Sequence, residues 1–359
     1  MSNRYVLGIF FCLVAVLSWG GMFPVMGSAL TVVNPFLFTA LRYTSATALF
    51  LLLLYWKEGG QALRPDGRAL AVWVLGSLGF AGFGFFVFLG QQMAGPSGAV
   101  SASVIMALMP LLSVLINWAW RGVKPLRYSL AFVSLSFFGV LCVVTRGDFL
   151  SLLRLQENVL ADLLILLGAA CWVVYTIGAS LFPGWSALRY TALTTALGVS
   201  TIWLVNGVLM ALGHNPPPTV ATVVSIGPQL AYMVLVAGFL GVLAWNSGNK
   251  ILTPVNGVLF MDVVPVTTFV IAAMGGYVFN GAELVGAGMT IAALILNNVY
   301  QRRAGARPGA AKPAPNACSL PGGGFRGLDD RIRRVDKQPE LFMTSPQGAE
   351  GKIVSGRSL

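Results

Sequence analysis

Asp262 is the acidic residue nearest the middle of a long apolar run, and it is the first candidate for chemistry. It lies about eight residues into the run 254–276, or about 12 Å along a helix that rises about 1.5 Å per residue. An ionisable group at that depth in a membrane is costly unless it faces a cavity or a partner. Asp262 therefore loads and releases a proton or binds a substrate amine, or else it is a structural carboxyl group bonded to a neighbouring helix.

Arg42 lies at a similar depth in the run 34–56. Its forked guanidinium donors fit Asp262 or a substrate carboxylate, and the alternative is a side chain that extends to the lipid headgroups. The five residues from Ala40 to Thr44 recur from Ala187 to Thr191, which makes Arg189 the counterpart of Arg42. Arg189 is closer to the end of its run, so we expect it to be an interface anchor unless that run begins nearer Pro183.

Aromatic and amide side chains gather at matching depths of several runs. Polar groups in lipid need partners, so these side chains should face the protein interior and line a cavity for a small amphipathic solute. For any single tryptophan, core packing or a place in the interfacial belt is the alternative. The substrate-binding or coupling residues that we predict beside Asp262 and Arg42 are Trp19, Tyr43, Gln91, Trp172, Tyr175, Trp245 and Asn246.

Proline and glycine mark further positions inside the runs. Pro110 and Pro265 hold corresponding places and are candidate hinges, because proline removes a backbone hydrogen bond and kinks a helix; a plain packing kink is the alternative. Glycine patches predict close helix contacts. The glycines concerned are Gly76, Gly79, Gly82 and Gly84 in one run, and Gly281, Gly286 and Gly288 in another.

The composition requires a membrane environment for these runs. Of 359 residues, 56% are hydrophobic and only 10% are charged, whereas a soluble domain carries about 25% charged residues. The runs lack the alternating pattern of barrel strands, so the predicted fold is all-α and integral to the membrane. About ten runs are long enough to span a bilayer, and they are 6–28, 34–56, 69–93, 98–119, 127–145, 160–181, 187–212, 228–249, 254–276 and 281–300.

The Lys and Arg residues predict the orientation of these spans. With the N-terminus inside, eleven basic residues fall on the cytoplasmic side, and only Arg146 and Arg154 fall outside. Both termini are then cytoplasmic. Residues 304–359 are polar and predict a disordered tail, either a simple extension or a segment that binds anionic lipid. Unpaired cysteines and a single loop histidine, His214, predict no metal or other cofactor, and the scattered charge predicts no nucleic-acid partner.

An internal repeat organises the chain. Besides the recurring segment around Arg42, Gly79–Gly82 matches Gly238–Gly241, and Met109–Leu111 matches Val264–Val266 in the same order. We predict two five-helix repeats at 1–150 and 151–303, followed by the tail at 304–359. Five is odd, so the second repeat is inverted, which is the architecture of many secondary transporters with a site between the halves.

Several segments resemble a known family. The sequences Ser18-Trp19-Gly20, Leu41-Arg42-Tyr43 and Met106–Leu111, with Gly281-Ala282-Glu283 later, resemble the drug/metabolite transporter superfamily, EamA family, over residues 6–300. The resemblance implies two inverted five-helix repeats in a bacterial plasma (inner) membrane and export or exchange of metabolites, amino acids or drugs. The family's first Gly-Glu pair is absent, because Trp120-Arg121-Gly122 stands there.

The predicted function is a secondary transporter for a small amphipathic metabolite, driven by a proton or by a counter-substrate. Its partners are the small molecule and the lipid bilayer. The alternatives are a non-transporting membrane scaffold or sensor, which the tail would serve, and an intramembrane enzyme. An enzyme needs a clustered nucleophile, base or metal set, and the runs contain no histidine and no pair of acids.

Overall fold

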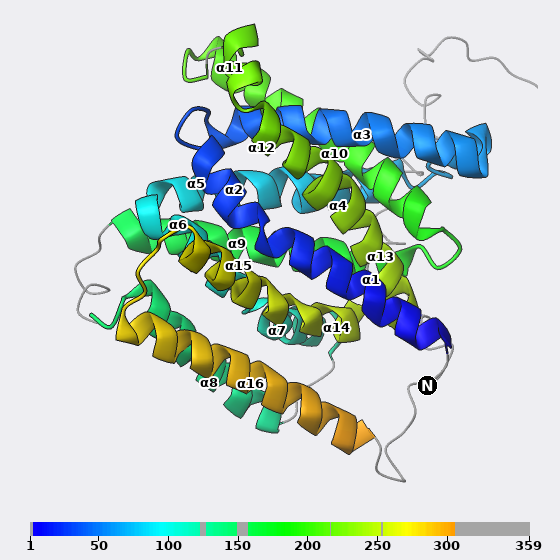
Figure 1. Cartoon of the computed structure of the whole chain (residues 1–359). Coiled ribbons are helices and arrows are strands. Elements are labelled where there is room, and N and C mark those ends of the chain that lie inside the picture. The colour runs from blue at the N-terminus through cyan, green and yellow to red at the C-terminus, as the bar shows by residue number, and fades with distance from the viewer. Residues whose placement is uncertain (1–2, 123–126, 149–156, 216, 253, 306–359) are drawn as a thin grey trace, which may run out of the picture. The chain divides into compact units, whose positions relative to one another are not determined.

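The computed structural model describes residues 3–122, 127–148, 157–215, 217–252 and 254–305. All regular structure within these ranges is helical, and Figure 1 shows it as an assembly of helices that lie alongside one another. The predicted tail, from residue 306 on, lies outside the described residues. The all-α prediction is therefore confirmed for the part of the chain that the structure describes.

The helices follow the predicted runs closely, although several runs are divided into shorter segments. The first half contains α1 (Asn3–Gly20), α2 (Met22–Ala29), α3 (Pro35–Glu58), η1 (Gly60–Leu63), α4 (Ala69–Gly76), η2 (Ser77–Gly82), α5 (Phe83–Met93), η3 (Gly95–Ser97), α6 (Gly98–Met106), α7 (Met109–Arg121) and α8 (Arg127–Val144). The second half contains α9 (Glu157–Gly178), η5 (Ala179–Leu181), α10 (Ala187–Ala211), α11 (Val220–Ser225), α12 (Gly227–Ala231), η6 (Tyr232–Leu240), α13 (Gly241–Leu252), α14 (Pro254–Gly257), η7 (Val258–Asp262), α15 (Val263–Met274) and α16 (Gly281–Gly305).

Six of the described helices are long and apolar enough to cross a membrane, and the bent pair Gly95–Met106 and Met109–Trp120 makes a seventh if it is one span. Shorter apolar helices occur at Ser134–Val143, Val263–Met274 and Gly281–Ala293. The structure therefore contains several helices that could each span a membrane, and a total of ten stays a prediction.

The breaks within runs have local causes. Proline occupies the first turn of α7, at Pro110, where its missing N–H costs nothing, and the axes of the two helix segments meet there at 47°. In the second half, the 3₁₀-helix η7 comes just before α15, and Pro265 lies in the first turn of α15. The two predicted hinge prolines thus lie next to corresponding breaks.

Two π-helical segments also hold corresponding places. They are η2, which contains Gly79 to Gly82, and η6, which contains Gly238. A π-helical turn shifts the backbone bonding by one residue and is often found at functional sites, because the local carbonyl groups become available to other donors.

The helices of the two halves pack in exchanged pairs. Helix α1 packs on α13, and its counterpart α9 packs on α5. Helix α1 also contacts α15, whereas α9 contacts α6 and α7; α3 packs on its own counterpart α10. Two structurally equivalent copies that face each other across a two-fold axis would give this exchange.

Helices α3 and α10 run antiparallel, as the contacts of their N-cap residues show. The side chain of Asn34 accepts a hydrogen bond from the backbone N–H of Leu37, and Ser186 accepts one from Arg189, each at 2.8 Å. Asn34 also contacts Asn215, beyond the end of α10, and Ser186 contacts Glu58, the last residue of α3. Each helix therefore begins where the other ends.

Glycine allows a close approach between α4 and α10. A Cβ atom at Gly76 would lie 2.0 Å from the Thr194 carbonyl oxygen, and one at Gly198 would lie 2.5 Å from the Gly76 carbonyl oxygen. Gly79, Gly82 and Gly84 also lie against neighbouring side chains, as predicted. The prediction was wrong for Gly281 and Gly288, whose Cβ atoms would meet no atom of the described residues within 4 Å, while Gly286 does approach Gly139.

Two glycines of α10 make a matched test of this packing. Gly198→Ala should lower the midpoint of thermal unfolding of the detergent-purified protein, because overpacking of a closed helix contact costs about 1–3 kcal/mol. Gly207→Ala, on the same helix, adds a Cβ that meets nothing within 4 Å, so its midpoint should stay equal or rise slightly. Equal midpoints for the two variants would contradict the close contact.

Candidate functional site: a small cavity between the two halves

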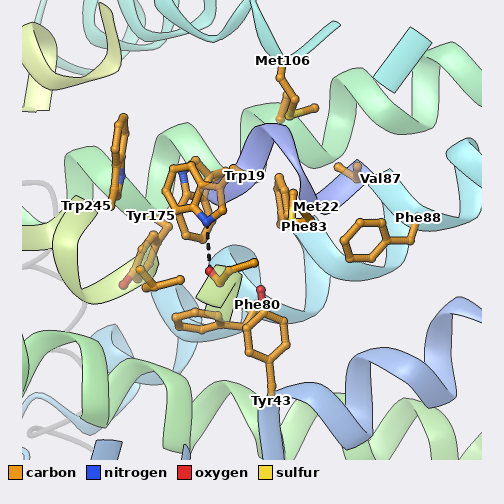
Figure 2. Close-up of a cluster of buried hydrophobic side chains, with 14 of the residues drawn as sticks. Trp19, Met22, Tyr43, Phe80, Phe83, Val87, Phe88, Met106, Tyr175 and Trp245 are labelled. Atoms are coloured by element: carbon orange, nitrogen blue, oxygen red, sulfur yellow. Dashed lines mark hydrogen bonds between the residues drawn. The ribbon is translucent and has the colours of Figure 1, made fainter. Parts of the chain in front are cut away.

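A small cavity lies where the two halves meet. About 10 Å³ of it is open to the centre of a water molecule, which is room for about one water. Figure 2 shows several of the aromatic side chains that surround it, among them Trp19, Phe83 and Tyr43. The lining consists of Trp19, Met22, Phe23, Arg42, Tyr43, Phe83, Met106, Trp172, Val242, Met261 and Val264.

Trp19 of α1 and Trp172 of α9, which lie in the helices before the two copies of the recurring segment, meet at this cavity. Their ring centroids are 5.3 Å apart with an interplanar angle of 89°, an edge-to-face pair. Trp245 packs on Trp19 at 5.2 Å, and Phe83 packs on Trp172 at 5.2 Å. Both halves thus contribute to one aromatic cluster that fills the space beside the cavity.

The π-helical segment η6 accepts hydrogen bonds from two of the predicted residues. Trp19 Nε1 donates to the Ala237 carbonyl oxygen at 2.9 Å (dashed in Figure 2), and Arg42 Nε donates to the Met233 carbonyl oxygen at 3.1 Å. Both donors come from the first half and both acceptors from the second. These bonds join the halves directly beside the cavity.

Arg42 is almost fully enclosed, with 1% of its surface exposed. Its guanidinium carbon lies 4.6 Å from the centroid of the Tyr43 ring and 5.8 Å from that of Phe88, so the charge rests on aromatic faces. Among the described side chains, its Nη1 atom has no hydrogen-bond partner, and no carboxylate pairs with it. The alternative of a headgroup contact does not fit this burial.

Tyr175, Trp245 and Asn246 form a polar network beside the cavity rather than in its lining. Asn246 Nδ2 donates to the Tyr175 hydroxyl and to Thr191 Oγ1, each at 2.7 Å. Trp245 Nε1 donates to Thr176 Oγ1 at 3.1 Å. This network holds α13 against α9 and α10, so these predicted residues support the cavity from one side.

Gln91 also lies outside the lining and bonds to a broken helix. Its Nε2 atom donates to the Phe23 carbonyl oxygen at 2.8 Å. Pro24, the next residue, has no N–H to offer the Gly20 carbonyl oxygen one turn earlier. Thr268 Oγ1 of α15 donates to that oxygen instead, at 2.7 Å.

The side chain of Asp262 lies outside the part of the chain that the structure describes. Its backbone ends η7, and its neighbour Met261 lines the cavity. The break in the helix thus lies beside the cavity, and the role of Asp262 stays a prediction.

Polar contacts join α3 and α10 at both ends of the pair. At one end, the asparagine contact joins Asn34 to Asn215, Asn215 to Asn206, and Asn206 to the Phe36 carbonyl oxygen. Sequence reasoning did not find it, because single asparagines in loops and at helix ends carry no distinctive signal.

At the other end, the arginine contact joins Arg189 to Asp66 at 2.7 Å and to the Ala62 and Arg64 carbonyl oxygens. The Ser186 hydroxyl donates to Glu58 beside it. Arg189, predicted as an interface anchor, therefore ties the start of α10 to the loop after α3.

Glu283 is a further buried charge that the site prediction did not include. Its side chain is 1% exposed and pairs with Arg146 Nε at 3.2 Å. The Tyr277 hydroxyl and the Asn280 N–H donate to the same carboxylate, each at 2.8 Å. Because Asn280 caps α16 in return, this capping box fixes the start of that helix to the end of α8.

Comparison with known proteins gives the family. The model of the EamA-like transporter family matches the chain twice, over residues 6–145 and 159–299. The chain belongs to the EamA-like transporter family. It is a multi-pass membrane protein and a transporter.

Relatives of this EamA-like transporter carry the same description. A protein named "Uncharacterized transporter YrdR" of Bacillus subtilis (strain 168) is 37% identical over 302 residues, 84% of this chain and 94% of the relative. A second from the same organism, "Uncharacterized transporter YyaM", is 26% identical over 70% of this chain and 80% of the relative. A solved structure, named "Crystal structure of protein", covers 85% of this chain and 99% of its own with a TM-score of 0.60 and 23% identity, which shows the fold alone.

The two tryptophans of the edge-to-face pair should respond differently to the same change. Trp19→Phe removes the donor to the Ala237 carbonyl oxygen and leaves a buried acceptor unbonded, at a cost of about 1–3 kcal/mol. Trp172→Phe removes an Nε1 that has no partner among the described residues, so it should lower the unfolding midpoint less. A larger loss in Trp172→Phe would contradict this account of the Trp19 bond.

Proposed function

We propose that this protein is a secondary transporter that moves a small amphipathic metabolite, an amino acid or a drug-like solute, across the plasma membrane by alternating access. The observation that carries the proposal is a cavity lined by both halves, together with polar contacts that join the two halves at each end of the α3–α10 pair. A cavity at the junction of two equivalent units is where such transporters bind their substrate, and rocking of one unit against the other would expose it to one side at a time.

The proposed architecture is ten membrane helices in two inverted repeats, 1–150 and 151–303, with both termini cytoplasmic. Two family matches of similar length and the exchanged helix pairs support it. An odd number of spans in each half also agrees with the antiparallel course of α3 and α10. The proposed direction is export or exchange, which follows from the family resemblance.

The asparagine contact and the arginine contact are the proposed gates. In the orientation that the basic residues favour, the asparagine contact is the outer gate and the arginine contact is the cytoplasmic gate. Each gate joins the start of one repeat-related helix to the segment after the other. Opening one gate while the other holds would connect the cavity to one side of the membrane at a time.

Asp262 is the proposed coupling residue. Its position beside a break, next to the cavity residue Met261, suits a carboxyl group that exchanges a proton when the cavity opens. Pro110 and Pro265, at corresponding breaks, are the proposed hinges.

The coupling role predicts the behaviour of Asp262→Asn. In proteoliposomes loaded with a mixture of amino acids and amphipathic drugs, the wild-type protein should move at least one solute in response to a pH or solute gradient. Asp262→Asn should abolish gradient-driven flux, because an amide cannot carry the proton, while its elution from a sizing column stays that of the folded protein. Wild-type flux from this variant would remove Asp262 from the mechanism, and no flux of any solute from the wild type would contradict the proposed function.

The gates predict opposite effects on access to the cavity. A cysteine at Met106, in a background without the native cysteines, reports access through its reaction with a membrane-impermeant maleimide. Asn215→Ala should speed labelling from the outer side, and Asp66→Ala should speed it from the cytoplasmic side, because each removes one gate. Faster labelling of both variants from the same side would contradict the assignment of the gates.

A further inference from the structure

The unsatisfied polar atoms in the cavity lining are all hydrogen-bond donors. Arg42 Nη1 and Trp172 Nε1 are buried and have no partner among the described residues. The other indole of the lining, on Trp19, already donates to Ala237. Neither a guanidinium nor an indole N–H can accept a hydrogen bond, so the two free groups need acceptors that the described residues do not supply.

These two donors come from different halves of the chain. Arg42 lies on α3 and Trp172 on α9, and both line the same cavity. A buried donor without a partner costs free energy, and a buried charge costs more. A ligand that offers two acceptor oxygens would satisfy both groups at once and join the halves through itself.

From this geometry we infer that the cavity binds the carboxylate of an organic acid with an apolar body, held between Arg42 and Trp172. A carboxylate has two acceptor oxygens and a single negative charge, which matches one guanidinium and one indole N–H. The remaining lining, Met22, Phe23, Phe83 and Val242 among it, receives the apolar body. A phosphate monoester would bring additional charge into a lining whose described residues include one cation.

The cavity has room for about one water in this structure, so the acid would enter when a gate opens and the aromatic side chains separate. The Arg42 guanidinium is held in place by the hydrogen bond from its Nε to the Met233 carbonyl oxygen and by the Tyr43 ring. Because these contacts use other parts of the guanidinium, Nη1 stays available to a ligand. The carboxylate assignment rests on the proposed transport function, since it names the substrate class of that same cavity.

Pairs of acid and amide test this directly. The full-length protein in detergent is titrated calorimetrically with indole-3-acetate, phenylacetate and 4-methylpentanoate, each beside its neutral primary amide. At least one acid should bind about tenfold or more tightly than its amide, because the amide presents one acceptor and turns an N–H₂ toward the donors. If no acid binds more tightly than its amide, the inference is overturned.

Variants then show which residues cause the preference for the acid over its amide. Arg42→Gln should bring the acid and its amide within about twofold of each other, and Trp172→Phe should weaken the acid several-fold while the amide changes less. Arg42→Lys keeps the charge but not the forked donors, so its preference for the acid should lie between those of Arg42→Gln and the wild type. This variant keeps the test valid if Arg42→Gln does not fold. Lys57→Gln, which removes an exposed cation from the same helix, should keep the full preference.

The outcomes separate this inference from the proposed function. Flux of some solute without any preference for acids would overturn the carboxylate site and leave the transporter standing. Preference for acids that survives Arg42→Gln would also overturn it. Tight acid binding with no flux of any solute would support the site and contradict transport.

Discussion

The structure depends on how the carbonyl groups at broken helices are satisfied away from water. Inside a bilayer each unbonded backbone group costs several kcal/mol, so a helix breaks only where another group supplies the missing donor. Beside the cavity those donors are side chains from the opposite half. Thr268 bonds to the Gly20 carbonyl freed by Pro24, Trp19 bonds to Ala237, and Arg42 bonds to Met233. The bonds that permit the breaks therefore also hold the two halves together.

Departures from symmetry give the cavity its chemistry. Trp19 and Trp172 hold corresponding positions, yet only Trp19 finds a carbonyl group in a π-helical segment. Arg42 and Arg189 also correspond, but Arg189 lies in the first turn of its helix and reaches the loop after α3, whereas Arg42 lies about one and a half turns deeper in its helix and stays enclosed. The two halves are similar in arrangement, yet these differences leave Arg42 Nη1 and Trp172 Nε1 without a partner among the described residues at their junction.

Much of this arrangement was predictable from the sequence. The apolar runs located nearly every helix, because twenty or so apolar residues in a row have few alternatives in a bilayer. Trp19, Trp172 and Arg42 were predicted to face the interior together, and all three line one cavity. The same evidence could not tell a residue in the lining from one behind it, so Gln91, Tyr175, Trp245 and Asn246 were grouped with Arg42 although they bond to helices around the cavity. The asparagine contact and the Arg146–Glu283 pair were missed because each joins helix ends that are far apart in the sequence and meet only in the folded protein.

The central claim is that the two ends of the α3–α10 pair open alternately around the cavity. Double electron–electron resonance can measure this with one pair of spin labels at Val32 and Leu212, near the asparagine contact, and another at Trp56 and Gly184, near the arginine contact. We expect two distance populations for each pair, with conditions that lengthen one distance shortening the other. A single fixed distance for both pairs, or distances that lengthen together, would contradict the account.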